Sequence, residues 1–129
     1  MPSEKILHFK DKNADFSSLS SKISDYLKSD GFTVQSSPTS NQGTVLQAKK
    51  GKFLAGMIDA DRAMTIYISG SPDDFTVRIG IGKWLEHLGI AMVETLLISD
   101  LFFVVDIAEM AWNLEIENKL VKEIESIVG

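Results

Sequence analysis

The sequence has no cysteine and only two histidines among its 129 residues. The lack of cysteine excludes disulfides and thiolate chemistry, and it agrees with a reducing compartment. His8 and His87 are far apart, and neither has an acid or a nucleophile at the spacing of a known motif. No serine lies in a Gly-x-Ser-x-Gly motif. The sequence therefore predicts no catalytic residue, no metal ligand and no cofactor, and we expect no enzyme.

Basic residues are also scarce. The 13 lysines and arginines are outnumbered by 18 acidic residues, which gives a net charge of −5. Residues 84–129 alone hold two bases and nine acids. Nucleic acid is therefore excluded as a partner, since phosphate neutralisation needs a concentrated basic surface. The opening MPSEKILHFK has no apolar run of signal-peptide length, so we expect a cytoplasmic location.

The periodicity of the apolar residues predicts an α+β fold within one domain, residues 1–129. Alternation predicts strands at 6–9, 32–37, 44–50, 64–69 and 75–81, with turns at 37–43 and 70–74. A three- and four-residue period predicts a helix between a cap at Asp15 and a stop at Gly31. From Lys83 onward the period is helical. We expect a two-layer sandwich in which the N-terminal helix and a long C-terminal helix, continuous or broken, cover an antiparallel sheet of four to five strands. The other face of the sheet should be wet.

The stretch MVETLLISDLFFVVDIAEMAW, residues 92–112, has the length of a membrane span but contains four acids. Its ten Leu, Ile, Phe and Val residues supply about −3 to −6 kcal/mol of insertion free energy. A central acid costs about +2.5 to +3.5 kcal/mol, so the four acids cancel this gain. On a helical wheel, Glu94, Asp106 and Glu109 share a polar stripe opposite a broad apolar face. The pattern favours a helix that covers a sheet.

Asp100 and three apolar residues do not fit this wheel. Asp100 falls on the apolar face, so either it caps a new helix after a break or it is a buried acid with a functional role. Ile98, Phe102 and Val105 fall in the polar stripe. They contact either the other helix, a second subunit or a membrane surface.

A second candidate surface is the loop GKFLAGMIDAD, residues 51–61, which is apolar where loops are usually polar. Phe53 and Leu54 lie beside Lys50 and Lys52, a combination that suits an anionic membrane surface. The alternative is a helical turn packed on the core. Arg62 follows the loop and is, with Asp100, a candidate polar anchor for a ligand.

Two segments, LQAKKGKF (residues 46–53) and DRAMTIYISGSPDDFTVRIGIGKW (61–84), are followed by the apolar stretch. Together they resemble a small uncharacterised prokaryotic domain family with an Asp-Arg-Ala strand, a Pro-Asp-Asp-Phe turn and a Gly-Lys-Trp strand end. The resemblance implies membrane proximity or an accessory module. The four acids in the C-terminal segment depart from the family's more hydrophobic pattern.

These observations give two hypotheses on function. The first is a non-enzymatic accessory domain whose partner is a second copy, another protein or an anionic membrane. The alternative is a binding protein for a small, lipid-like apolar ligand, held in a cavity between the sheet and the C-terminal helix.

Overall fold

The computed structural model describes residues 5–39, 43–49, 62–84, 89 and 114–129. Within these ranges the elements are β1 (Lys5–Lys10), α1 (Phe16–Ser29), β2 (Thr33–Pro38), β3 (Thr44–Lys49), β4 (Arg62–Ser71), β5 (Asp74–Lys83) and α3 (Leu114–Val128). The predicted α+β fold is confirmed, with five antiparallel strands, an N-terminal helix and a C-terminal helix. Strands β4 and β5 are longer than predicted, because only the two residues Pro72 and Asp73 separate them. Asp100 and the rest of residues 90–113 lie outside the described residues, so the continuity of the long C-terminal helix stays a prediction.

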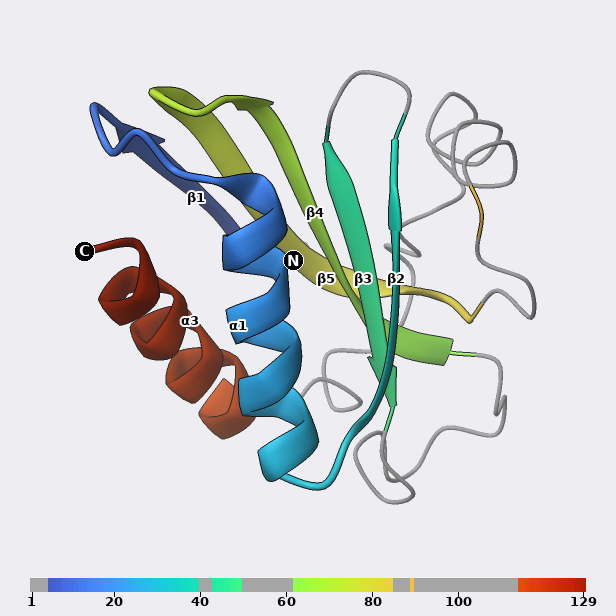
Figure 1. Cartoon of the computed structure of the whole chain (residues 1–129). Helices are drawn as coiled ribbons and strands as arrows, with labels where there is room; N and C mark the ends of the chain where they lie inside the picture. The colour runs from blue at the N-terminus through green and yellow to red at the C-terminus, as the bar shows by residue number, and fades with distance from the viewer. Residues whose placement is uncertain (1–4, 40–42, 50–61, 85–88, 90–113) are drawn as a thin grey trace.

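The sheet is open, and its strand order is β1-β5-β4-β3-β2. Strands β2 to β5 follow one another as antiparallel neighbours, whereas β1 pairs with β5 at the far edge. The chain must therefore pass from one edge of the sheet to the other between β1 and β2. Helix α1 makes this crossing over one face of the sheet (Figure 1).

Helix α1 forms where the sequence predicts it, for local reasons. The Asp15 side chain caps its start by accepting a hydrogen bond from the backbone N–H of Ser17 at 3.1 Å. Gly31, which follows the helix, has a φ of 94°, a conformation that favours glycine. The inward face carries Leu19, Ile23 and Leu27, which are at most 4% exposed.

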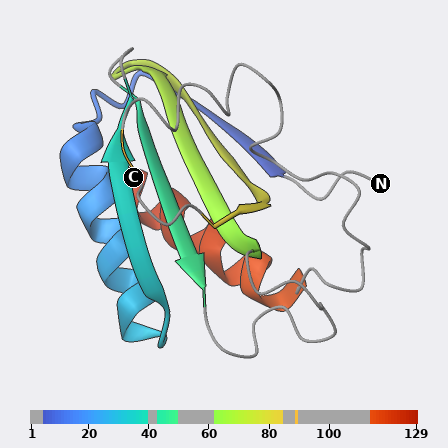
Figure 2. The same cartoon turned by 90° about the vertical axis from the view of Figure 1, so that its right-hand side faces the viewer.

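The core lies between this face of the sheet and the two helices, which run side by side on it (Figures 1 and 2). Helix α3 contributes Leu120 and Ile124, both at most 1% exposed. The sheet contributes the alternate side chains of its strands: Leu46, Ala48, Met64, Ile66, Ile68, Phe75, Val77 and Ile79. Period-two strands and period-3.6 helices thus bury their apolar sides against each other, as the alternation predicts.

The face of the sheet opposite the helices was predicted to contact water. For β4 and β3 this prediction is wrong. Val45 and Gln47 of β3 and Thr65 of β4 point away from the helix-facing residues, yet all three are 0% exposed. Helices α1 and α3 cover the opposite face and do not account for this burial. The alternation identified the residues of each face correctly, but polar side chains do not by themselves require contact with water when they pair with each other.

The turn between β4 and β5 is fixed by the loop between β1 and α1. The backbone N–H of Asp11 donates to the Asp73 carbonyl at 2.7 Å, and that of Ala14 donates to the Pro72 carbonyl at 3.0 Å. Asp11 and Asn13 have φ values of 59° and 48°, which Asp and Asn tolerate better than most residues. The Pro-Asp-Asp turn therefore ties the tip of the central hairpin to the start of α1.

We expect Gly43→Ala to destabilise the fold by about 1–3 kcal/mol, as overpacking does. A Cβ at this position would lie 2.6 Å from the Ile68 backbone carbonyl oxygen and 2.9 Å from Thr39 Oγ1. Urea unfolding measures the free-energy change. Gly89→Ala is the matched control, since a Cβ there meets nothing within 4 Å. Equal stability of the two variants would contradict the close packing at Gly43.

Candidate functional site

The candidate residues taken from the sequence fall almost entirely outside the described residues. These are the ligand candidate Asp100, the stripe residues Ile98, Phe102 and Val105, and the loop residues Lys50, Lys52, Phe53 and Leu54. Arg62 is placed as the first residue of β4, where its backbone pairs with Lys83 of β5. The contacts predicted for these side chains therefore stay predictions.

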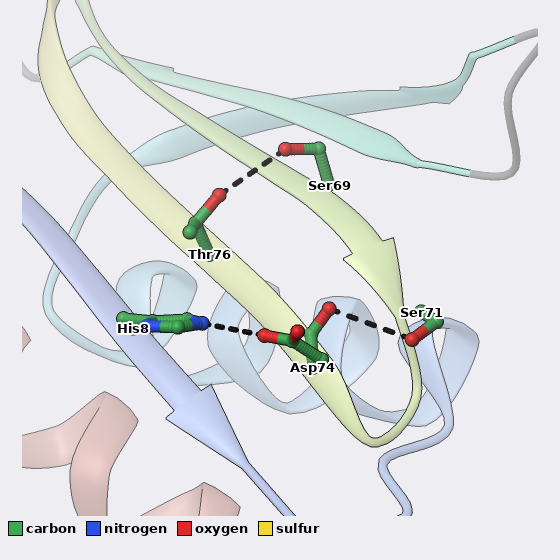
Figure 3. A network of polar contacts seen from close by, with 5 residues as sticks. All are labelled: His8, Ser69, Ser71, Asp74 and Thr76. Atoms are coloured by element: carbon green, nitrogen blue, oxygen red, sulfur yellow. Dashed lines mark hydrogen bonds and ion pairs between the residues drawn. The ribbon is translucent and has the colours of Figure 1, made fainter.

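One polar cluster lies on the second face of the sheet, near the β4–β5 turn (Figure 3). His8 of β1 contacts Asp74 of β5, with 2.5 Å between Nε2 and Oδ1. The two residues are diagonal neighbours on adjacent strands, a spacing at which long side chains interact. The hydrogen bond from His8 lowers the pKa of the Asp74 carboxyl below its ordinary value of 3.8, and the charges of His8 and Lys10 act in the same direction.

The same cluster contains serine, but it does not have the geometry of a catalytic triad. In a triad, histidine lies between the nucleophile and the acid. Here Asp74 lies in the middle, and Ser71 Oγ reaches only its backbone carbonyl, at 3.5 Å (Figure 3). The side chains of His8 and Asp74 are 51% and 60% exposed, so water screens the pair. The described residues also contain no group of three His, Cys, Asp or Glu that could hold a metal ion.

We expect His8→Ala to raise the pKa of Asp74 toward 3.8, because the variant removes the hydrogen bond that favours the carboxylate. Since the folded pKa is lowered, the contribution of this contact to stability is present above pH 3.8. It is lost as the pH falls through the lowered value. An NMR titration of the side-chain carboxyl carbon measures the pKa. Lys10→Gln is the control and should cause a smaller rise, whereas an unchanged Asp74 pKa in His8→Ala would contradict the assignment.

A second polar group lies across the second face on β2, β3 and β4. Gln35 Nε2 donates to Gln47 Oε1 at 3.0 Å, and Gln47 Nε2 donates to Thr65 Oγ1 at 3.2 Å. The two glutamines face each other in the β2–β3 register, and Gln47 faces Thr65 in the β3–β4 register. Buried polar groups that pair in this way hold neighbouring strands in one register. We assign this row a structural role.

A cleft of about 530 Å³ lies between α1 and the β2–β3 hairpin. Helix α1 lines it with four serines from two successive turns, Ser17, Ser20, Ser21 and Ser24. The hairpin adds Ser36 and Thr44, and the single charges of Asp25 and Lys28 also line the cleft. This volume lies within the range of small-molecule sites. The cleft was not predicted from the sequence, although the spacing of the serines at positions i, i+3, i+4 and i+7 indicates a helix face that carries hydroxyl groups.

The predicted apolar-ligand cavity is not supported by the described part of the C-terminal helix. Leu120 and Ile124 of α3 are buried in the core and fill the space against the sheet. The rest of that hypothesis concerns Asp100 and residues outside the described ranges.

In the part of the chain that the structure describes, no helix combines the length and the apolar character needed to cross a membrane.

Comparison with known proteins adds no family and no relative. No protein-family model matches the chain, and neither a curated protein nor a solved structure is significantly similar to it. The resemblance to a prokaryotic domain family therefore stays a prediction.

Proposed function

We propose that this chain is a non-enzymatic interaction domain that self-associates through the outer edge of β2. The observation that carries the proposal is that β2 is an uncharged edge strand of six residues, TVQSSP. Among the described residues, no strand pairs with its outer side. The backbone groups on an open edge can pair with another chain, and natural proteins usually block such edges with charges or proline.

The two edges of this sheet differ in how they are protected. Strand β1, KILHFK, has a lysine at each end. Pairing two copies of β1 antiparallel over their full length would place Lys5 opposite Lys10, and like charges in opposite positions are destabilising. Strand β2 has no charged residue, and only Pro38 at its end limits pairing. The free edge that accepts a second copy is therefore β2.

Pairing of two β2 strands related by a twofold axis would join two five-stranded sheets into one. Such an interface is isologous, because the same strand serves both subunits. The rows of backbone hydrogen bonds give affinity, and the alternate side chains of β2 give register. A cytoplasmic location, which is also part of the proposal, agrees with the lack of cysteine.

We expect light scattering to give twice the chain mass of 14.2 kDa for the wild type. Ser36→Lys should return the mass to that of one chain, because an exposed lysine in the middle of an edge strand opposes pairing. Ile6→Lys is the matched control. Ile6 is 59% exposed on the other edge strand, so its replacement should leave the dimer intact.

Circular dichroism shows whether each variant retains its fold. A wild-type chain that remains monomeric at its highest soluble concentration would refute self-association. A dimer that persists in Ser36→Lys would place the interface elsewhere.

A further inference from the structure

The cleft between α1 and the β2–β3 hairpin contains a buried hydroxyl group that has no partner in the part of the chain that the structure describes. Ser20 lines this cleft and is only 9% exposed. Among the described residues, no hydrogen bond to its hydroxyl is formed, not even to the carbonyl one turn earlier in α1. Ser29, on the same helix, does form such a bond, to the Tyr26 carbonyl at 2.7 Å. A buried polar group is normally paired, so this hydroxyl is available to a ligand.

The cleft exists because the side chains around it are short. Ser36 lies on the helix-facing side of β2, opposite Leu46 of β3. At the end of the hairpin, Thr44 pairs with Pro38 in the register. On α1, Ser20 is buried and Ser24 is half-buried beside the core residues Leu19 and Ile23, whereas Ser17 and Ser21 are exposed. Several of the other lining residues are exposed as well, so the cleft opens to solvent and a ligand can enter it.

Gly43, at the end of the hairpin, also lines the cleft and is held by hydrogen bonds to Thr39. Thr39 Oγ1 accepts a hydrogen bond from the backbone N–H of Gly43 at 2.9 Å, and the Thr39 N–H donates to the Gly43 carbonyl at 2.9 Å. Gly43 is buried, with Ile68 close behind it. These contacts fix the position of Gly43, and with it this part of the lining.

The lining indicates the chemistry of the ligand. Hydroxyl groups both donate and accept hydrogen bonds, so they pair well with other hydroxyl groups. Asp25 and Lys28 contribute one charge of each sign, which gives the lining no net charge and does not favour an anion. Phe16 also lines the cleft and offers an apolar surface for the C–H face of a ligand ring. A fully apolar molecule would leave the Ser20 hydroxyl unpaired, at a cost in affinity.

We propose that this cleft is a binding site for a neutral polyhydroxylated molecule, a sugar or polyol of one or two rings, and that Ser20 hydrogen-bonds it. Ser24 and Ser36 add hydroxyls from the helix and the sheet, and Asp25 accepts from a ligand hydroxyl at the rim. The site does not depend on self-association, because every group named belongs to one copy of the chain.

The test is an NMR titration of the full-length chain with D-glucose, trehalose and myo-inositol, and with inorganic phosphate as the charged comparison. At least one of the three neutral probes should shift the backbone amides of Ser20, Ser24 and Thr44 in a saturable way. No saturable shift with any neutral probe, or saturation with phosphate alone, would overturn the proposal. Light scattering on the same samples reports self-association separately, so failure of one proposal is distinguishable from failure of the other.

Ser20→Ala separates a binding role of the hydroxyl from a structural role. Loss of one hydrogen bond to the ligand should weaken binding about five- to tenfold. The Tm should stay equal or rise, because the hydroxyl has no partner among the described residues and alanine has the higher helix propensity. The matched control is Ser18→Ala on the exposed side of α1, which should leave binding unchanged. Unchanged affinity in Ser20→Ala, or a fall in its Tm, would overturn the role of Ser20.

Ser24→Leu tests the cleft as a whole. A leucine at this half-buried position fills the space with an apolar side chain and should abolish the saturable shifts. Retention of the wild-type circular dichroism spectrum shows that the variant folds. Wild-type affinity in a folded Ser24→Leu variant would place the binding site outside the cleft.

Discussion

The structure depends on the passage of α1 across the sheet. Strands β1 and β2 lie at opposite edges and run in the same direction, so a connection between them has to cross the strands that separate them. The apolar face made by Leu19, Ile23 and Leu27 holds this connection to the sheet. The hydrogen bonds from Asp11 and Ala14 to the β4–β5 turn fix where the crossing begins. The positions of both open edges and of the cleft beside β2 follow from this one connection.

The width of the sheet explains why two helices are needed to cover it. It also shows that the cleft is not a gap left by too few helices. Five strands spaced about 4.8 Å apart make a sheet roughly 19 Å wide. One helix with its side chains is about 10–12 Å across, so two helices cover this width. Helices α1 and α3 are therefore together wide enough to cover this face of the sheet. The open space at β2 arises from short side chains at Ser20, Ser24 and Ser36 and not from an uncovered strip of the sheet.

The parts of the fold that sequence predicts are those set by near neighbours along the chain. The period of Leu19, Ile23 and Leu27 defines one face of α1, and the alternation of Met64, Ile66 and Ile68 defines one face of β4. Pairing between distant segments leaves no such period. His8 and Asp74 are 66 residues apart, and their contact follows from β1 pairing with β5 at the edge, an arrangement that no local pattern contains. The sequence pattern does not reveal the cleft for the same reason, since its serines come from two separate elements, α1 and β2.

Two buried polar residues, Gln47 and Ser20, show how the same physical rule has two outcomes in this molecule. Gln47 is 0% exposed and pairs on both sides, with Gln35 and with Thr65, so its burial cost is offset within the sheet. Ser20 is 9% exposed and finds no partner among the described residues. An unpaired buried hydroxyl costs about 1–3 kcal/mol unless another molecule completes its hydrogen bond. Alanine at position 20 would avoid this cost and favour the helix, so stability alone does not explain the serine. In the binding site that we propose, a hydroxyl group of the ligand would complete this hydrogen bond.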